Sequence, residues 1–285
     1  QRDTSGHGTL LASISAGSYT DGYVGVAPGA ELLVVKLKQS KQYLRDFFLI
    51  KDDVPAFEES DIMLALRFLE DYAIRLGKPL IIIFGLGSAN GSRTGASPLA
   101  EMMENLTKKP NISVITCMGN EANNKCHYKG TVMSALVPDV MEINVDGTGK
   151  GFTMEIWADS LDILSVSIES PSGEYVPRIP ARMGASMEYT FLYEGSTVTV
   201  DYQITENVAG MEVIFVRLKT PVEGTWKFYI YSLTNIKGSY NAWLPLKQFS
   251  GQDIYFLKSD PDTTLTVPAA ADGVISVGAY NHYTG

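Results

Sequence analysis

The sequence of residues 79–84, PLIIIF, is a short apolar run rich in β-branched side chains, with no alternation between apolar and polar positions. Such a run is typical of a strand that is buried on both faces, as in a parallel sheet covered by helices. Two further stretches have the same character, ISVITC at residues 112–117 and ELLVVKL at residues 31–37. We therefore predict that all three are buried strands of one parallel sheet.

Helical patterns lie beside these runs. In SDIMLALRFLEDYAIRLG (60–77), Ser60 is suited to cap the start of a helix and Gly77 to end it. The apolar residues of this segment fall on one helical face: Ile62, Leu66, Leu69, Ala73 and Leu76. In SPLAEMMENLTKKP (97–110), the serine is suited to the N-cap and the following proline to the first helical position. The alternation of strand and helix predicts an α/β layer fold.

Between residues 128 and 260 the chain changes character. Its apolar stretches have strand length, turn residues separate them, and no convincing helix pattern occurs. These stretches are FTMEIWA (152–158), ILSVSIES (163–170), STVTVDYQI (196–204), MEVIFVRL (211–218) and TWKFYIYSL (225–233). We predict an all-β sandwich or jelly roll of about five to nine strands.

The α/β character returns at GVISVGAYN (273–281), which we predict to be another buried strand. We therefore divide the chain into an α/β segment at 1–127, an inserted all-β module at 128–260 and a return to the α/β segment at 261–285. The chain stops a few residues after this last strand. We expect that both of its ends are truncated.

Composition limits the classes of function. The 285 residues carry 23 basic and 32 acidic side chains, a net charge of -9, and no basic stripe, which argues against a nucleic-acid partner. No apolar run approaches the length that a membrane span needs, and the first residues do not resemble a signal peptide. With 45% hydrophobic and 19% charged residues, the chain has the composition of a protein with a packed core.

The two cysteines, Cys117 and Cys126, are too few for a disulfide framework. Cys117 ends an apolar run, so we interpret it as a small buried side chain. A Cys117–Cys126 bridge and a metal site with His127 are the alternatives. A structural zinc site uses four ligands, and the sequence shows no second cluster, so we assign no metal.

Five blocks of the sequence resemble motifs of the subtilisin-like serine proteases, the subtilases, and they occur in the order of that family. The blocks are GHGTLLASISAG (6–17), GVAPGAELLVVKL (25–37), IIIFGLGSANG (81–91), ISVITCMGNEAN (112–123) and TVPAAADGVISVGAYN (266–281). A lone His-Gly-Thr would be weak evidence, but the ordered set covers about half of the chain. The resemblance implies a subtilisin-like parallel sheet with flanking helices and hydrolysis of peptide bonds.

The resemblance also implies roles for single residues. His7 is the general base, and the Asn120 side chain donates to the oxyanion. Gly85, Leu86 and Gly87 match the edge that pairs with an extended substrate. Met118 and Gly119, after Cys117, match a wall of the specificity pocket. Taken alone, each has an ordinary reading: a histidine in a glycine-rich turn is usually a solvated loop residue, a Gly-Asn pair usually forms a turn, and a methionine usually fills a core.

Two members of the family's triad have no counterpart in the 285 residues. The aspartate normally lies tens of residues before the histidine, and Asp3 is too close, so we expect it in the loop before the helix. The serine normally lies in Gly-Thr-Ser-x-Ala-x-Pro, which does not occur; GASP (95–98) and GAS (184–186) are superficial matches. We predict that the isolated chain does not hydrolyse peptides, because it has no serine for acyl transfer.

The matched blocks also depart from the family pattern. Leu10 stands where a second histidine is usual, and Gly85 and Ser88 replace the usual serine and glycine around Leu86-Gly87. The position of the all-β insertion resembles clostridial Csp-type germination proteases, a subtilase branch with a jelly-roll insertion. Three aromatic side chains of the insertion are suited either to stacking on a sugar or to the core, and the core is the usual place at strand spacing: Trp226, Tyr240 and Trp243.

We interpret the chain as part of a subtilisin-like serine endopeptidase that acts on peptides or proteins. The resemblance implies an extracellular or spore-associated bacterial protein and a chemistry that requires no cofactor. Calcium often stabilises this family, but no ligand set can be assigned. The alternatives are a pseudoprotease that acts as a binding or signalling scaffold, and a carbohydrate-binding protein. Substrate preference, pro-peptide and oligomeric state do not follow from the sequence.

Overall fold

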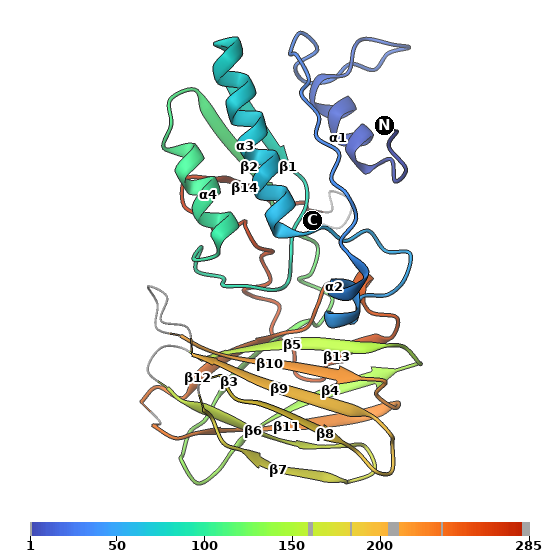
Figure 1. The fold of residues 1–285 in the computed structure, drawn as a ribbon, viewed down its shortest axis with the longest axis vertical. Coiled ribbons are helices and arrows are strands. Elements are labelled where there is room, and N and C mark those ends of the chain that lie inside the picture. Colours follow the sequence, from blue (N-terminus) through green and yellow to red (C-terminus); the bar gives the residue numbers. More distant parts are fainter. Residues whose placement is uncertain (1, 159–161, 183, 205–210, 235, 281–285) are drawn as a thin grey trace.

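The computed structural model describes residues 2–158, 162–182, 184–204, 211–234 and 236–280. Two parts follow one another along the long axis of the molecule (Figure 1). One part holds a small parallel sheet with helices, and the other holds two antiparallel sheets. The chain is therefore a mixed α/β protein, as predicted. The final residue of the predicted strand at 273–281 and His282 lie outside the described residues.

The parallel sheet has the strand order β1 (Leu80–Phe84), β2 (Ile112–Cys117), β14 (Ile275–Val277). Helices α3 (Glu59–Leu76) and α4 (Pro98–Thr107) pack against it. The core between helices and sheet consists of buried apolar side chains: Leu66, Ile82, Leu99, Met103, Leu106 and Val114. The predicted strands 79–84 and 112–117 and the two predicted helices are thus confirmed.

The helix ends were predicted in part. Ser97 caps α4 by accepting a hydrogen bond from the N–H of Ala100, and Gly77 ends α3 with a φ of 62°. The prediction that Ser60 caps α3 is wrong, because the helix begins at Glu59. The Glu59 carboxylate accepts a hydrogen bond from the N–H of Leu99 at 2.9 Å, which connects the first turns of the two helices.

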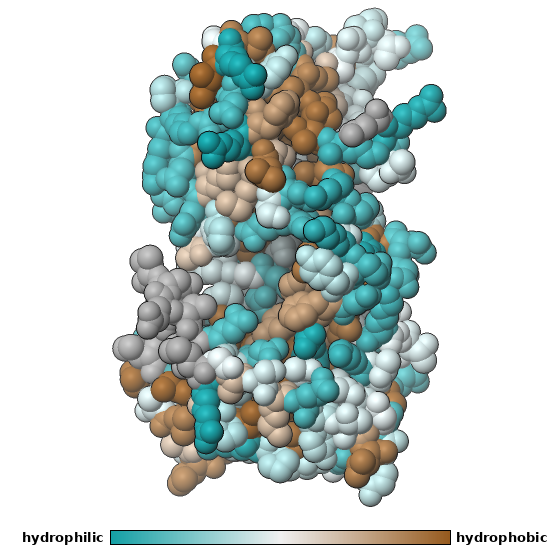
Figure 2. All heavy atoms as spheres, in the orientation of Figure 1, coloured by the Kyte–Doolittle hydropathy of each residue, from teal (hydrophilic) through white to brown (hydrophobic). Residues whose placement is uncertain are grey.

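The predicted strand at 31–37 does not form. These residues belong to no strand and have no strand partner in the described part of the chain, and the Val34 side chain is 70% exposed. A strand forms only where a neighbour accepts and donates backbone hydrogen bonds, which an apolar pattern does not specify. Burial on both faces is also wrong for the sheet, since Ile81, Ile275 and Val277 are exposed. Apolar surface lies between α1 and α3 in Figure 2.

Two short helices complete this part: α1 (His7–Ala16) and α2 (Gln42–Phe47). The family resemblance of residues 6–17 implies a helix at α1, whereas the sequence does not predict α2, which has only six residues. Arg45 of α2 is buried and donates to the carbonyls of Lys51 (2.8 Å) and Val54 (2.9 Å). A tertiary interaction thus holds a segment that is too short to be stable as an isolated helix.

Residues 127–256 contain the two antiparallel sheets. The six-stranded sheet has the order β3 (His127–Thr131), β12 (Ser239–Trp243), β5 (Gly151–Ala158), β10 (Glu212–Lys219), β9 (Thr197–Ile204), β8 (Ser186–Thr190). The five-stranded sheet has the order β13 (Asp253–Phe256), β4 (Asp139–Asp146), β11 (Gly224–Ser232), β6 (Leu164–Glu169), β7 (Tyr175–Ile179). A short 3₁₀ helix, η1, covers Lys247–Phe249. The jelly-roll topology and the boundaries 1–127, 128–260 and 261–285 stay predictions.

An aromatic core joins the two sheets. The Phe191 and Trp226 rings meet edge to face at 5.0 Å, and Tyr128 of β3 lies 5.7 Å from Phe256 of β13. Trp226 and Tyr240 are fully buried and Trp243 is 6% exposed. The core interpretation of these three aromatic residues is therefore confirmed, and none of them offers a free face to a sugar.

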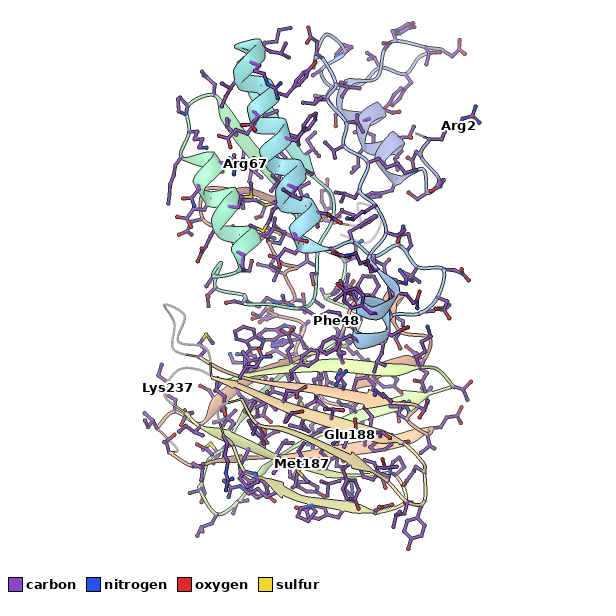
Figure 3. The ribbon with its side chains drawn as sticks, viewed as in Figure 1. Arg2, Phe48, Arg67, Met187, Glu188 and Lys237 are labelled. Atoms are coloured by element: carbon purple, nitrogen blue, oxygen red, sulfur yellow. The ribbon has the colours of Figure 1, made fainter. Side chains whose placement is uncertain are left out.

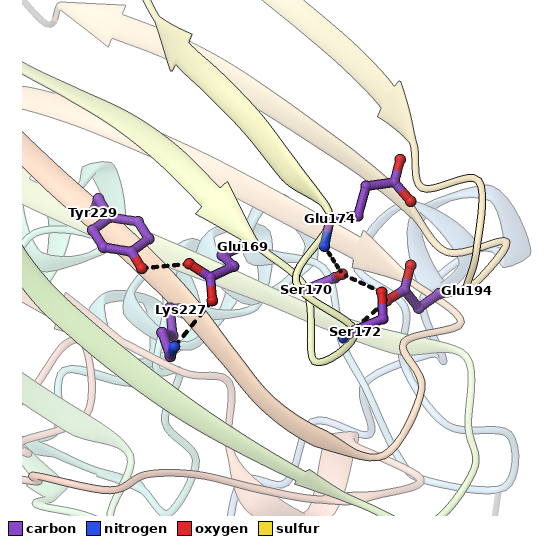
Figure 4. Close-up of polar contacts among 7 residues, drawn as sticks. All are labelled: Glu169, Ser170, Ser172, Glu174, Glu194, Lys227 and Tyr229. Carbon is purple, nitrogen blue, oxygen red and sulfur yellow. Dashed lines mark hydrogen bonds and ion pairs between the residues drawn. The ribbon is translucent and has the colours of Figure 1, made fainter.

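The turn between β6 and β7 is closed by a serine (Figure 4). The N–H of Ser170 donates to the Glu174 carbonyl at 2.9 Å, and its Oγ accepts from the Glu174 N–H at 3.1 Å. Ser172 donates to the Glu194 carboxylate, which belongs to a different loop. On the outer face of the same sheet, Glu169 pairs with Lys227 at 3.0 Å. These polar contacts help to fix one end of the five-stranded sheet.

Helix α2 joins the two parts of the molecule. Phe47 stacks on Phe215 of β10 with ring centroids 5.8 Å apart, and Phe48 meets the same ring edge to face at 6.0 Å. Phe48 lies where α2 approaches the strands (Figure 3). An ion pair between Asp52 and Lys150 adds a polar contact at 2.6 Å. The antiparallel sheets therefore pack directly against the segment before α3.

The cysteines form no disulfide. Cys126 is buried, and Cys117 is half-buried rather than fully buried as predicted. The His127 ring is buried and stacks on Trp243, with Nδ1 bonded to the Asp260 carbonyl. Within the described ranges, no group of three or more His, Cys, Asp or Glu side chains gathers to hold a metal ion. Among the same residues, no helix is long and apolar enough to cross a membrane.

Candidate active site

The candidate site begins at the first residue of α1, His7, whose N-cap is Gly6 in the left-handed conformation (φ 79°). The side chain of Asp3 organises this helix start. Its Oδ1 accepts from the Gly6 N–H at 2.9 Å, and its Oδ2 accepts from the Thr9 N–H (2.9 Å) and hydroxyl (2.7 Å). The hydrogen bond from the Thr9 side chain is the largest cause that lowers the pKa of Asp3. Asp3 thus lies in the loop before the helix, as expected.

Small residues allow the following segment to run against the end of α1. The N–H of Val26 donates to the Ile14 carbonyl at 3.0 Å, and the N–H of Gly25 donates to the Gly17 carbonyl at 2.9 Å. A Cβ added at Gly25 would lie 2.3 Å from the Gly17 nitrogen. This distance is too short for any side chain to be accommodated at position 25. Gly17 and Gly25 therefore have a packing reason, which is the close approach of two backbones.

His7 contacts the end of β1. Its Nε2 lies 2.9 Å from the carbonyl oxygen of Gly85. A carbonyl oxygen only accepts, so in this arrangement Nε2 carries the hydrogen. A Cβ at Gly85 would lie 2.4 Å from Cδ1 of Leu11 and 3.3 Å from Nε2 of His7. The glycine at this position therefore lets α1 approach the strand.

The segment 85–87 lies beside the end of β2. The Cys117 thiol donates to the Leu86 carbonyl with 3.4 Å between sulfur and oxygen. Burial raises the pKa of this thiol, which favours its protonated, donating form. Immediately after the segment, Ser88 and Val267 exchange two backbone hydrogen bonds of 3.0 and 2.9 Å. The predicted substrate edge is therefore held from two sides.

The predicted pocket wall continues from β2. The N–H of Met118 donates to the Val277 carbonyl and its carbonyl accepts from the Thr266 N–H, both at 3.0 Å. Gly119 has a φ of 90°, a conformation that favours glycine. Asn120 follows and is exposed; its carbonyl accepts from the Asn124 side chain at 3.4 Å.

The site residues gather because of the sheet's topology. The carboxyl ends of parallel strands meet at one edge, where α/β proteins place their ligand sites. Residues 85–87 follow β1 and residues 118–120 follow the parallel strand β2, while α1 brings His7 to the same edge. The structure thus brings the predicted residues of three separate sequence blocks together.

A buried cluster supports the loop that follows this edge. Oε2 of Glu155, in β5, accepts from the Gly91 N–H at 2.9 Å and from the Trp157 indole N–H at 3.0 Å. The Arg93 guanidinium lies 4.9 Å over the Trp243 ring. Burial raises the pKa of Glu155 and lowers the pKa of Arg93 to about 10. The sequence pattern gives no signal for the contacts of Gly91 with Glu155 and of Arg93 with Trp243, because each joins residues that are far apart in the chain.

The comparisons with known proteins agree with this arrangement. The model of the subtilase family matches residues 1–212. Among solved structures, the Clostridium perfringens CspB protease is similar to the chain with a TM-score of 0.83 and 25% sequence identity. The match covers 99% of this chain and 56% of that protease, so the chain spans little more than half of the protease's length. No curated protein sequence matches.

Proposed function

Because the chain belongs to the subtilase family of peptidases, we propose that it carries part of the active site of a subtilisin-like serine endopeptidase. In this proposal His7 is the general base that activates the serine and then the general acid that protonates the leaving amine. Asn120 donates from its side chain to the oxyanion. Residues 85–87 pair with the extended substrate backbone, and Met118 and Gly119 line the specificity pocket.

The contact between His7 and Gly85 is the observation that supports this function best. It places an exposed imidazole at the carboxyl edge of the sheet, next to the segment that the proposal assigns to the substrate. The helix that carries His7 is held by the Asp3 hydrogen bonds at its start and by backbone bonds at its end. A general base requires such a rigid position relative to the substrate.

The same contact supports the finer proposal that the isolated chain does not hydrolyse peptides. A base that takes the serine proton through Nε2 needs its own hydrogen on Nδ1, and the triad aspartate fixes this tautomer. With Nε2 donating to the Gly85 carbonyl, the ring hydrogen lies on Nε2 instead of Nδ1. The 285 residues also contain no Gly-Thr-Ser-x-Ala-x-Pro motif to supply the nucleophile.

Other properties follow from the proposed family role. The substrate is a peptide or protein, and the proposed acyl transfer uses side chains and backbone donors without a cofactor. We assign no calcium ligands. An extracellular or spore-associated bacterial location and a jelly-roll topology for residues 128–260 are part of the proposal, on the strength of the resemblance to Csp-type proteases.

Hydrolysis by the natural-length protein and by the 285-residue chain tests the function. We expect the natural-length protein to cleave peptides and to react with a fluorophosphonate serine probe, and the chain alone to do neither. In the natural-length protein, N120A should lower kcat about 10²–10³-fold, whereas N123A, at an exposed position three residues away, should not. H7A should abolish both cleavage and probe labelling.

The two remaining outcomes point elsewhere. A natural-length protein that binds peptides but neither cleaves them nor reacts with the probe would favour the pseudoprotease scaffold. Serine-dependent cleavage by the 285-residue chain would contradict the proposal that it is inactive alone.

A further inference from the structure

Two loops lie side by side at one end of the two antiparallel sheets. The first loop, residues 132–138, connects β3 to β4. The second connects β11 to β12 and is described at residues 233–234 and 236–238. Since β3 pairs with β12 and β4 pairs with β11, both loops cross from one sheet to the other at the same end. A backbone hydrogen bond from the Val132 N–H to the Gly238 carbonyl, at 2.8 Å, joins them.

The two loops expose a set of large apolar side chains, which we call the apolar end patch. Each of its members is more than half exposed: Met133, Leu136, Val137, Leu233 and Ile236. Figure 2 shows apolar surface on the side of the antiparallel sheets where Figure 3 labels Lys237 of the second loop. Single exposed apolar side chains are common, but five on two adjoining loops form the kind of patch that marks an interaction site.

Backbone groups beneath the patch are already paired. The Asp162 carboxylate accepts hydrogen bonds from three successive backbone N–H groups of the second loop, those of residues 236–238, at 2.7–3.0 Å. In the first loop, the Ser134 hydroxyl accepts from the Leu136 N–H at 3.2 Å. These donors keep their partners when the loops enter an apolar medium, so that transfer does not leave them unsatisfied.

The charge of the two loops differs from that of the whole chain. The chain has a net charge of -9, whereas residues 132–138 and 233–238 contain one lysine, Lys237, and no aspartate or glutamate. Asp139, directly after the first loop, accepts from the hydroxyls of Tyr128 (3.0 Å) and Tyr240 (2.7 Å). The patch is therefore apolar with a basic side chain beside it, in an acidic protein. This combination favours a partner with a negatively charged surface.

The size of the patch distinguishes a lipid partner from a protein partner. A stable protein interface takes about 20–30 residues from each side, more than the two loops contain. A bilayer surface requires only that a few apolar side chains reach the boundary between headgroups and acyl chains, with basic side chains among the headgroups. We propose that the apolar end patch binds the surface of an anionic lipid bilayer, with its apolar side chains inserted and Lys237 beside the lipid phosphates. This role does not depend on the proposed peptidase function.

Flotation with lipid vesicles tests the proposal. The natural-length protein is mixed with vesicles of equal parts phosphatidylglycerol and phosphatidylcholine, or with vesicles of phosphatidylcholine alone. We expect binding to the anionic vesicles, and L136D and I236D should each lower it at least ~10-fold, because each replaces an inserted apolar side chain by a charged one. K237E should lower it about fivefold or more. Since Leu136, Ile236 and Lys237 are exposed, these variants should keep the urea midpoint of the wild type.

L192D is the matched control. Leu192 is 84% exposed and Leu136 is 90% exposed, so the two leucines offer similar apolar surface. The turn that carries Leu192 lies at the end of the sheets that holds Gly151, the first residue of β5. The patch lies at the end that holds Ala158, the last residue of that strand. L192D should therefore leave vesicle binding unchanged.

A second measurement reports insertion itself. The three native tryptophans are at most 8% exposed, so a tryptophan placed on the surface gives a distinct signal. The emission of L136W should shift to shorter wavelength with anionic vesicles and be quenched by brominated lipid, whereas L192W should show neither effect.

Three results would overturn the proposal: no vesicle binding by the natural-length protein, binding that L136D and I236D leave intact, or equal shifts in L136W and L192W. Dimers that form in the wild type without vesicle binding, and that L136D abolishes, would also overturn it and assign the patch to a second copy of the chain.

Discussion

Oε2 of Glu155 accepts a hydrogen bond from the backbone N–H of Gly91, at 2.9 Å, and so joins the six-stranded sheet to the loop after the proposed substrate edge. The same oxygen also accepts from the Trp157 indole N–H. Gly91 lies three residues beyond Ser88, which pairs with Val267 beside the proposed specificity pocket. The antiparallel part of the molecule therefore takes part in holding the edge of the site.

Replacement of Glu155 tests this support. E155A leaves two buried donors without their acceptor, at about 1–3 kcal/mol for each, so the free energy of unfolding should fall by about 2–4 kcal/mol. E155Q keeps an acceptor and should change it by less than about 1 kcal/mol. Urea denaturation measures both, and hydrogen exchange should report a faster Gly91 amide in E155A. Glu188→Ala is the control, because Glu188 is exposed and lies on the edge strand β8 (Figure 3). Its free energy of unfolding should change by no more than about 0.5 kcal/mol.

The Phe215 ring should carry much of the contact between α2 and β10. F215A removes a side chain that is 7% exposed and touches both Phe47 and Phe48. A loss of about 3 kcal/mol in the free energy of unfolding is expected, at the lower end for a buried phenylalanine because Phe47 is partly exposed. Amide exchange in α2 should accelerate as well. Tyr43→Ala, on the exposed side of α2, should do neither; equal effects of the two variants would contradict the prediction.

Glu212 should make stability depend on pH between about 5 and 8. Burial raises the pKa of this carboxyl to about 7, and among the described residues its Oε1 has no hydrogen-bond partner. The folded pKa lies above the unfolded value, so the folded state retains a proton that the unfolded state releases. The resulting stability is fully present below the unfolded pKa and is lost as the pH rises through 7, on the order of 3 kcal/mol.

The measurement compares urea denaturation at pH 5.5 and 8.5. The wild type should be less stable at the higher pH, and E212Q should remove most of this difference and be the more stable protein at pH 8.5. Leu164 N–H, which donates to Glu212 at 2.6 Å, keeps an acceptor in E212Q. Glu101→Gln, at an exposed position of α4, should leave the pH dependence of stability unchanged. A wild type whose stability is flat over this range would refute the role of Glu212.

The tautomer of His7 can be observed directly. The sequence holds three histidines, so ¹⁵N-histidine labelling gives a short set of ring signals, and H7A assigns those of His7. The contact with the Gly85 carbonyl requires a hydrogen on Nε2 in the isolated chain. An Nδ1-protonated ring would show that the contact is absent in solution and that the base is already in its catalytic tautomer.

Local signals account for the elements that the sequence predicts well. Ser97 and Pro98 mark the start of α4 because capping and proline geometry act within a few residues. The segment 31–37 has an equally apolar pattern but lacks a neighbouring strand in the described chain, and the pattern carries no information about neighbours. Helix α2 was missed for the converse reason, since the Arg45 side chain holds it through carbonyls outside the helix.

The candidate site also has features that the sequence predicts and features that it does not. The family resemblance of ordered blocks predicts which residues gather, and the structure brings His7 and Gly85 into contact across 78 residues of sequence. Neither the bond from Thr266 to Met118 nor the bond from Gly91 to Glu155 has a sequence signal. Both depend on how backbones approach in space, which motif spacing does not encode.

The third strand of the parallel sheet has a consequence for biosynthesis. β14 pairs with β2, yet residues 118–274 lie between them. The ribosome therefore synthesises every strand of both antiparallel sheets before it synthesises β14. A long connection raises the entropic cost of bringing the strands together only slowly with length, and a folded intervening segment shortens the effective distance. We therefore expect the antiparallel sheets to fold first during synthesis, with the edge that carries His7 and Gly85 completed last. Mutations that slow folding of the antiparallel sheets would then leave the nascent chain with an open parallel sheet, a target for chaperones and proteases.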